Sequence, residues 1–121
     1  MNILIKVIQE NLTPNYLNKK YQKLFTPDKH PYFGHCYMAT EVLYHLKAKE
    51  LGYKPQVMRV GDKTHWYLRK GDDIIDITKE QFPFELDYSL GRGCGFLTKE
   101  PSQRTKMYMY FMLQLEDIGK K

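Results

Sequence analysis

The 121-residue sequence has only two cysteines, Cys36 and Cys94, and no apolar run close to eighteen residues. Two distant cysteines exclude the disulfide framework of a small secreted domain. The lack of a long apolar run argues against a membrane-spanning helix, and the first residues lack the cleavage site of a signal peptide. We therefore expect a single cytoplasmic domain, residues 1–121, with reduced thiols and no membrane partner.

The sequence also lacks concentrated basic motifs. The formal net charge is +5, but the lysines and arginines are scattered, and the densest cluster is the short stretch NKKYQK. No RGG segment, zinc-finger spacing or RNA-recognition signature is present. A solvated basic surface is the favoured interpretation, so a nucleic-acid partner is not expected, whereas an anionic ligand remains open.

What is present predicts an α+β fold. The stretch NILIKVIQ fits an edge strand or a short helix, because its periodicity does not separate the two. Thr13 and Pro14 are typical of a helix start, and a further helix is predicted from Cys36 to about Leu51-Gly52. N-terminal helices should pack on an antiparallel sheet of three or more strands, followed by a C-terminal helix.

The strands and the last helix follow from local patterns. The segments QVMRV, THWYLR and DIIDIT alternate as strands, with the turn sequence KGDD between the last two. Ser102 is predicted to cap the C-terminal helix. The predicted buried side of that helix carries Met107, Phe111, Leu115 and Ile118.

The register of the predicted hairpin can be derived from its turn. A turn at Gly71-Asp72 places Tyr67 opposite Asp76, so His65 and Asp76 become diagonal neighbours on one face. Their Cβ atoms would lie about 7 Å apart, within reach of a carboxylate–imidazole contact. The alternate residues, Trp66, Leu68, Ile75 and Ile77, would face the core.

Cys36 stands where a helix is predicted to begin. Free N–H groups and the positive end of the helix dipole favour a thiolate there. An imidazole that accepts the thiol proton needs an acceptor on its other nitrogen, so Cys36, His65 and Asp76 have the residue types for acyl transfer at an amide, thioester or ester. Each also has a structural interpretation: a buried thiol, a packed histidine and a turn-capping aspartate.

A cysteine at the head of the core helix, with His and Asp on adjacent antiparallel strands, resembles the minimal core of papain-like and transglutaminase-like cysteine enzymes. HWYLRKGDDIIDIT is similar to their His strand and the strand after it, although Ile77 stands where the related motif has proline. This resemblance spans about Gly34 to Thr78. It implies Cys36 as nucleophile, His65 as base, Asp76 as orienter, and no cofactor.

The resemblance also bears on activity and substrate. It implies a protease, deamidase or transglutaminase-like hydrolase or acyl transferase acting on a protein, peptide or small acyl substrate. The oxyanion-hole side chain of the family precedes its cysteine, and the candidates here are Gln22, Tyr32 and His35. The pieces GHCY and GRGCGFLTKEPSQR also resemble small uncharacterised phage and bacterial proteins, which supply no activity.

The glycine-rich stretch GRGCGFLTKEPSQR has two interpretations. Its glycines let the backbone approach another group closely, and Arg92, Lys99 and Arg104 could surround an anion at the N-terminus of the last helix. It is not a P-loop, because the Gly-Lys-Ser/Thr ending is missing. The alternative is a loop that covers the sheet.

Two other function classes compete with catalysis. Zinc is not expected, because the chain has no CxxC or HxxxH spacing. The potential ligands would be His30, His35, Cys36, His65 and Cys94. The main rival is a non-catalytic binding protein on a degenerate papain-like fold, which holds an anionic ligand such as a nucleotide, or a host protein. A thiol exposed beside His65 would favour catalysis, and a sealed thiol would favour binding.

Overall fold

The structure is a computed structural model, which describes residues 2–17, 19–26, 29–30 and 32–120, with backbone alone at 14 and 115–120. Its α-helices are α1 (Asn2–Glu10), α2 (Lys19–Leu24), α3 (Cys36–Leu43) and α4 (Gln103–Lys120). Strands β1 (Lys54–Val60), β2 (Lys63–Lys70), β3 (Asp73–Ile75) and β4 (Arg92–Gly93) form one antiparallel sheet in the order β3-β2-β1-β4. The predicted α+β class is confirmed.

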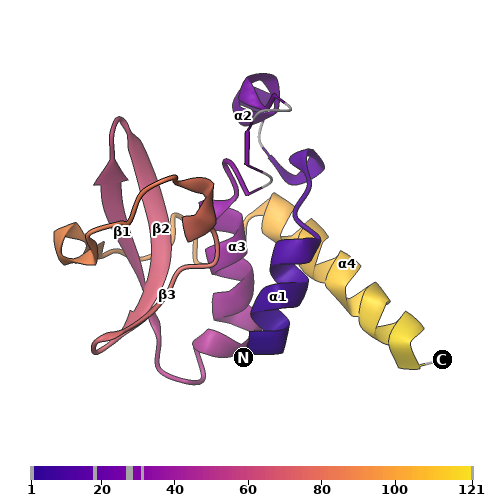
Figure 1. Cartoon of the computed structure of the whole chain (residues 1–121). Helices are drawn as coiled ribbons and strands as arrows, with labels where there is room; N and C mark the ends of the chain where they lie inside the picture. Colours follow the sequence, from indigo (N-terminus) through magenta and orange to yellow (C-terminus); the bar gives the residue numbers. More distant parts are fainter. Residues whose placement is uncertain (1, 18, 27–28, 31, 121) are drawn as a thin grey trace.

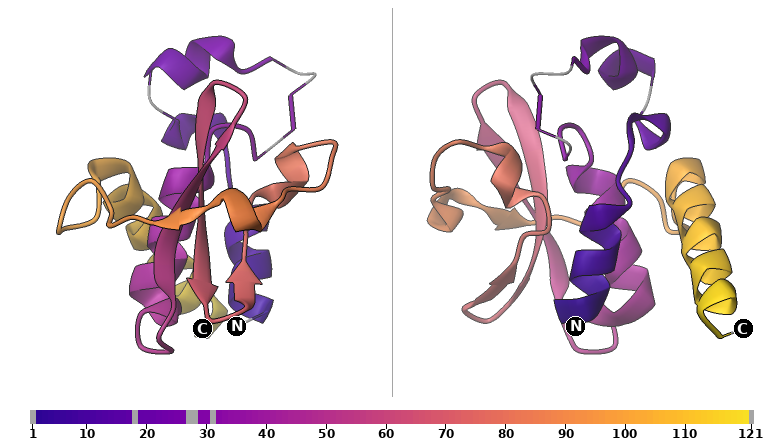
Figure 2. Two further views of the ribbon diagram at one scale, coloured as in Figure 1. Left: turned by 90° about the vertical axis from the view of Figure 1, so that its left-hand side faces the viewer. Right: turned by 45° about the vertical axis from the view of Figure 1, so that its right-hand side comes forward.

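The elements stack in layers around α3. Figure 1 shows the sheet on one side of α3 and helices α1 and α4 on the other, and the right-hand view of Figure 2 also has the sheet and α4 on opposite sides. The main core cluster joins α1, α3 and β2 through side chains that include Ile8, Val42, Leu43 and Leu68. Helix α3 continues directly into a π-helical turn, η2 (Tyr44–Ala48), so the helix predicted from Cys36 is present.

The ambiguous N-terminal stretch is helical. Leu4, Ile5, Ile8 and Leu12 all contact the core cluster, and they recur at the spacing of one helix face. Ile8 is completely buried. Packing against α3 therefore decides between the two states that the sequence alone left open.

The predicted hairpin register is present, but its second strand is short. Arg69 pairs with Ile74 and Leu68 with Ile75. Strand β3 ends at Ile75, so the predicted strand DIIDIT is wrong in its second half. Asp76, the residue after the strand, bonds to His65 and Tyr88 through its side chain.

The C-terminal helix is capped as predicted, but Met107 does not lie on its buried side. Ser102 Oγ accepts a hydrogen bond from the Thr105 amide at 3.3 Å. Met107 is 54% exposed, whereas Tyr108 is fully buried and donates its hydroxyl to the Ile8 carbonyl at 2.6 Å. This long-range bond fixes the rotation of α4; the side chains of Leu115 and Ile118 lie outside the described residues.

A buried carboxylate joins the start of α4 to α3. Glu41 is fully buried, and its Oε1 accepts the Ser102 amide at 2.9 Å.

Among the described residues, no helix has both the length and the apolar character needed to cross a bilayer.

Candidate functional site

Cys36 is the first residue of α3, and the turn before it depends on glycine. Gly34 has φ 77°, in the left-handed region that favours glycine, and a Cβ there would lie 2.9 Å from Leu17 Cδ2. His35 at the N-cap makes no side-chain capping bond. The partly exposed thiol therefore lies at a helix N-terminus, with its Sγ 3.7 Å from the Thr64 carbonyl oxygen.

His65 and Asp76 form a buried pair. Nε2 of His65 lies 2.6 Å from Oδ2 of Asp76, and each side chain is 1% exposed. The contact predicted from the hairpin register is therefore present. Nδ1 of His65 is also buried, and it has no hydrogen-bond partner in the described part of the chain.

The environment of His65 favours its charged form. Burial alone lowers the pKa of the imidazole, but the hydrogen bond to Asp76 and the charge of its carboxylate, with a contribution from the nearby Cys36, outweigh burial and raise the pKa to about 9. At neutral pH the ring is therefore an imidazolium beside the Asp76 carboxylate.

Aromatic rings and a second donor fix this pair. Phe82 contacts the His65 ring edge-on, with centroids 4.9 Å apart, and Tyr67 stacks on it at 6.3 Å. Tyr88 Oη donates to Oδ2 of Asp76 at 2.8 Å. Burial and the nearby Asp76 charge raise the pKa of Tyr88, so its phenol stays a donor.

Tyr88 was not identified from the sequence. It lies in the short 3₁₀ helix η4 (Tyr88–Leu90), within a segment that has no strand or helix periodicity. Only the folded chain brings this loop against β2, where Tyr67 and Tyr88 rings pack with centroids 5.0 Å apart.

At Gly91, in the glycine-rich stretch, the fold leaves no space for a side chain. A Cβ at this position would lie 1.7 Å from the hydroxyl oxygen of Tyr67. The φ of Gly91 is −82°, so the constraint is space and not backbone conformation. The predicted close approach is thus made to Tyr67, the ring that stacks on His65, and not to a ligand.

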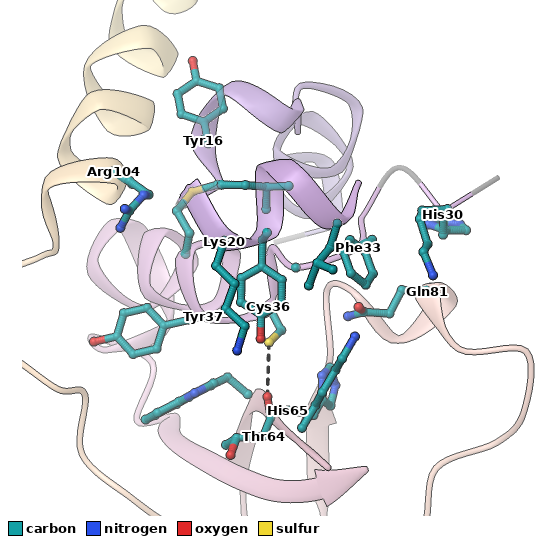
Figure 3. A pocket seen from close by; sticks show the side chains of 18 of the residues that line it. Tyr16, Lys20, His30, Phe33, Cys36, Tyr37, Thr64, His65, Gln81 and Arg104 are labelled. Atoms are coloured by element: carbon teal, nitrogen blue, oxygen red, sulfur yellow. Dashed lines mark hydrogen bonds between the residues drawn. The ribbon is translucent and has the colours of Figure 1, made fainter. Parts of the chain in front are cut away.

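Cys36 and His65 line one cavity of about 1050 Å³ (Figure 3). Its walls come from α2, residues 29–30, 33–34 and 36–38, the start of β2, residues 81–83 and the start of α4. Several of the lining side chains are aromatic: Tyr16, Tyr21, Phe33, Tyr37, Trp66 and Phe82. The thiol is therefore accessible and not sealed.

The predicted oxyanion residues do not reach this cavity. Gln22 is exposed on α2 and donates to the Leu17 carbonyl at 2.9 Å. His35 is fully buried, with Nε2 2.8 Å from the Thr13 carbonyl oxygen, and burial lowers its pKa. Both side chains form hydrogen bonds within the segment between α1 and α3, and neither lines the cavity that exposes the thiol.

Tyr32 is also absent from the cavity wall. It packs against the main core, and its pKa is raised by burial and by the charges of Glu80 and Glu10. The cavity instead contains Gln81, whose Nε2 donates to Thr78 Oγ1 at 3.1 Å. Other donors at the thiol are the first-turn N–H groups of α3, which have no partner within their helix.

The predicted anion-binding residues do not meet at one place. Arg92 is exposed on β4 opposite Val57 and lines neither cavity. Lys99 lines a second cavity of about 560 Å³ together with Cys94, whereas Arg104 lines the Cys36 cavity. Pairing of the glycine stretch with the edge of β1 separates Arg92 from the other two.

The potential zinc ligands do not assemble in the described part of the chain. No three His, Cys, Asp or Glu side chains there lie close enough together to hold a metal ion. Nδ1 of His30 accepts the Tyr32 amide at 3.1 Å, and the two thiols lie in different cavities.

The chain was compared with protein-family models, with curated proteins and with solved structures. None of these comparisons gave a match, so the resemblance to papain-like and transglutaminase-like enzymes stands on the residues alone.

Proposed function

We propose that this protein is a small cysteine-dependent hydrolase or acyl transferase, with Cys36 as nucleophile, His65 as acid and base, and Asp76 as orienter. The observation that carries this proposal is the buried His65–Asp76 pair in the cavity that also exposes Cys36. Nucleophile, base and orienting acceptor are the elements that acyl transfer requires. The resemblance to papain-like enzymes supports the same roles.

The first half of the reaction forms a thioester. The Cys36 thiolate attacks the carbonyl carbon of an amide, thioester or ester, and the carbonyl oxygen becomes an oxyanion. First-turn N–H groups of α3 would stabilise this oxyanion. When the intermediate collapses, the bond to the leaving group breaks and the imidazolium of His65 supplies the proton that group needs.

The second half returns the free enzyme. Water, or an amine in transamidation, loses a proton to the now neutral His65 and attacks the thioester. The carbon–sulfur bond breaks and the thiolate of Cys36 leaves. Throughout, Asp76 accepts the Nε2 hydrogen bond, which keeps Nδ1 for the reacting groups.

The test is acyl-enzyme formation on a defined residue. The protein is incubated with an activated ester such as p-nitrophenyl acetate, and the adduct is located by intact mass and peptide mapping. We expect one acetyl group on Cys36 that disappears with time, no thioester adduct in Cys36→Ser, and normal labelling in Cys94→Ser. A non-catalytic binding protein would acylate both cysteines slowly and equally, which would contradict the proposal.

A further inference from the structure

The Cys36 cavity has an unbalanced set of charges. Its described lining residues include Lys20, Lys29, Lys63 and Arg104, but Asp62 is the only acid among them. None of these four cations forms an ion pair within the described part of the chain. They come from four separate segments of the chain, so folding concentrates positive charge around the cavity that contains the thiol.

Two of these lysines lie over the same aromatic ring, that of Phe33. The ammonium groups of Lys63 and Lys29 lie 4.5 and 5.3 Å from the centroid of the Phe33 ring. Lys63 begins β2 two residues before His65, and Phe33 lies three residues before Cys36. The shared ring therefore holds two positive charges beside the segments that carry the imidazole and the thiol.

With Asp62 as the one acid among its described lining residues, the cavity keeps an excess of positive charge that a bound anion would balance. Cations over an aromatic face gain only a modest stabilisation, whereas an anion in a partly enclosed cationic cavity gains from several charges together. The surrounding rings would bury the apolar part of the same ligand.

We infer that the substrate carries a carboxylate or phosphate near the reacting carbonyl, and that Lys63 and Lys29 bind this anionic group. This inference rests on the proposed function and names the substrate class for the same site. This site lies around Phe33 and not at the glycine-rich stretch, and of the three cations predicted there Arg104 lines the same cavity.

The test uses two alkylating probes that differ in charge. Iodoacetate and iodoacetamide are reacted with the Cys94→Ser protein, and the ratio of their rates is divided by the ratio for the neutral thiol N-acetylcysteinamide. We expect this normalised preference for iodoacetate to be roughly tenfold at low ionic strength, the lower end for a charged cleft. It should fall steeply as sodium chloride is added.

A matched pair of variants locates the effect. Lys63→Gln should remove most of the preference, because it removes the cation nearest the Phe33 ring. Lys70→Gln makes the same charge change at the other end of β2, outside both cavities, and should leave the preference unchanged. A preference near one, or equal effects of the two variants, would overturn the inference.

A second measurement does not need a reactive thiol. Trp66, the only tryptophan, lines the same cavity, so its fluorescence reports ligands in the Cys36→Ser protein. We expect saturable changes with succinate and none with the neutral succinamide; inorganic phosphate, titrated in parallel, identifies the preferred anion. Failure of both anions would overturn the inference, whereas an inert Cys36 with anion binding intact would contradict only the proposed function.

Discussion

The two cysteines have similar surroundings and different structural positions. Each is half-buried and lines a cavity that also contains a histidine and several lysines. Cys36 begins a helix beside the His65–Asp76 pair. Cys94 lies in a loop, where its amide donates to the Pro55 carbonyl at 3.2 Å and its thiol to the Gly95 carbonyl at 3.5 Å.

The two cavities contain similar residue types but differ in how these residues are arranged around the thiol. Positive charge and a nearby histidine are common to both cavities, so they do not distinguish the thiols. A helix N-terminus together with an imidazole held by a buried carboxylate occurs only at Cys36 among these two sites. The reactivity of a thiol depends on such oriented groups, so Cys94 is a control within the same molecule.

The largest expected effect comes from removing the imidazole. His65→Ala should slow iodoacetamide labelling of Cys36 at pH 7 at least tenfold, since the proposed mechanism needs this imidazole to accept the thiol proton. Labelling of Cys94, followed by peptide mapping in the same sample, should not change. His45→Ala removes the histidine of the second cavity and should leave Cys36 labelling at the wild-type rate. Equal effects of the two variants on Cys36 would contradict a specific role of His65.

The free energy of unfolding should depend on pH because His65 titrates. The pKa of His65 is about 9 in the fold against about 6.5 for an unperturbed histidine. The folded state binds this proton more tightly, so the stabilisation is complete below about pH 6.5 and is lost as the pH rises through 9. The loss is on the order of 3 kcal/mol.

Urea unfolding between pH 6 and 10 measures this effect. His65→Gln should flatten the decrease in the free energy of unfolding, whereas His45→Gln should keep it. Wild-type and His65→Gln curves that stay parallel across this range would show that the buried pair does not stabilise the fold.

A smaller effect is expected from adding one carbon to the loop that contacts Tyr67. Gly91→Ala should lower the free energy of unfolding by about 1–3 kcal/mol, because the methyl group overlaps the Tyr67 hydroxyl. Gly95→Ala is the matched control in the same stretch, since its Cβ would meet no atom within 4 Å. Thermal or urea unfolding of both variants checks this, and equal destabilisation would contradict the contact.

The smallest effect concerns the second donor to Asp76. Tyr88→Phe removes one hydrogen bond to the carboxylate and should cost about 1–2 kcal/mol of stability. It should also slow Cys36 labelling a few-fold through a less well-oriented His65, while Cys94 labelling stays constant. Tyr110→Phe, on the exposed side of α4, is the control, and an unchanged Cys36 rate in Tyr88→Phe would limit Tyr88 to a packing role.

The sequence by itself determined the features that depend on neighbouring residues. The turn at Gly71 and the alternation of β2 set the hairpin register, and therefore the His65–Asp76 contact. The helix start at Cys36 and the cap at Ser102 also follow from local patterns. These features were predictable because period, turn chemistry and capping act within a few residues.

Only the tertiary structure decided what depends on contacts between distant segments. The N-terminal stretch is helical because it packs on α3. The hydrogen bond from Tyr108 to the Ile8 carbonyl sets the rotation of α4, so that Tyr108 is buried and Met107 is exposed. Segments outside the strands and long helices bring Tyr88 to Asp76 and lysines to the cavity of Cys36. Gln22 and His35 instead bond to the carbonyl groups of Leu17 and Thr13. Loops have no periodicity from which such contacts can be read, because their side chains are positioned by the elements that they cross.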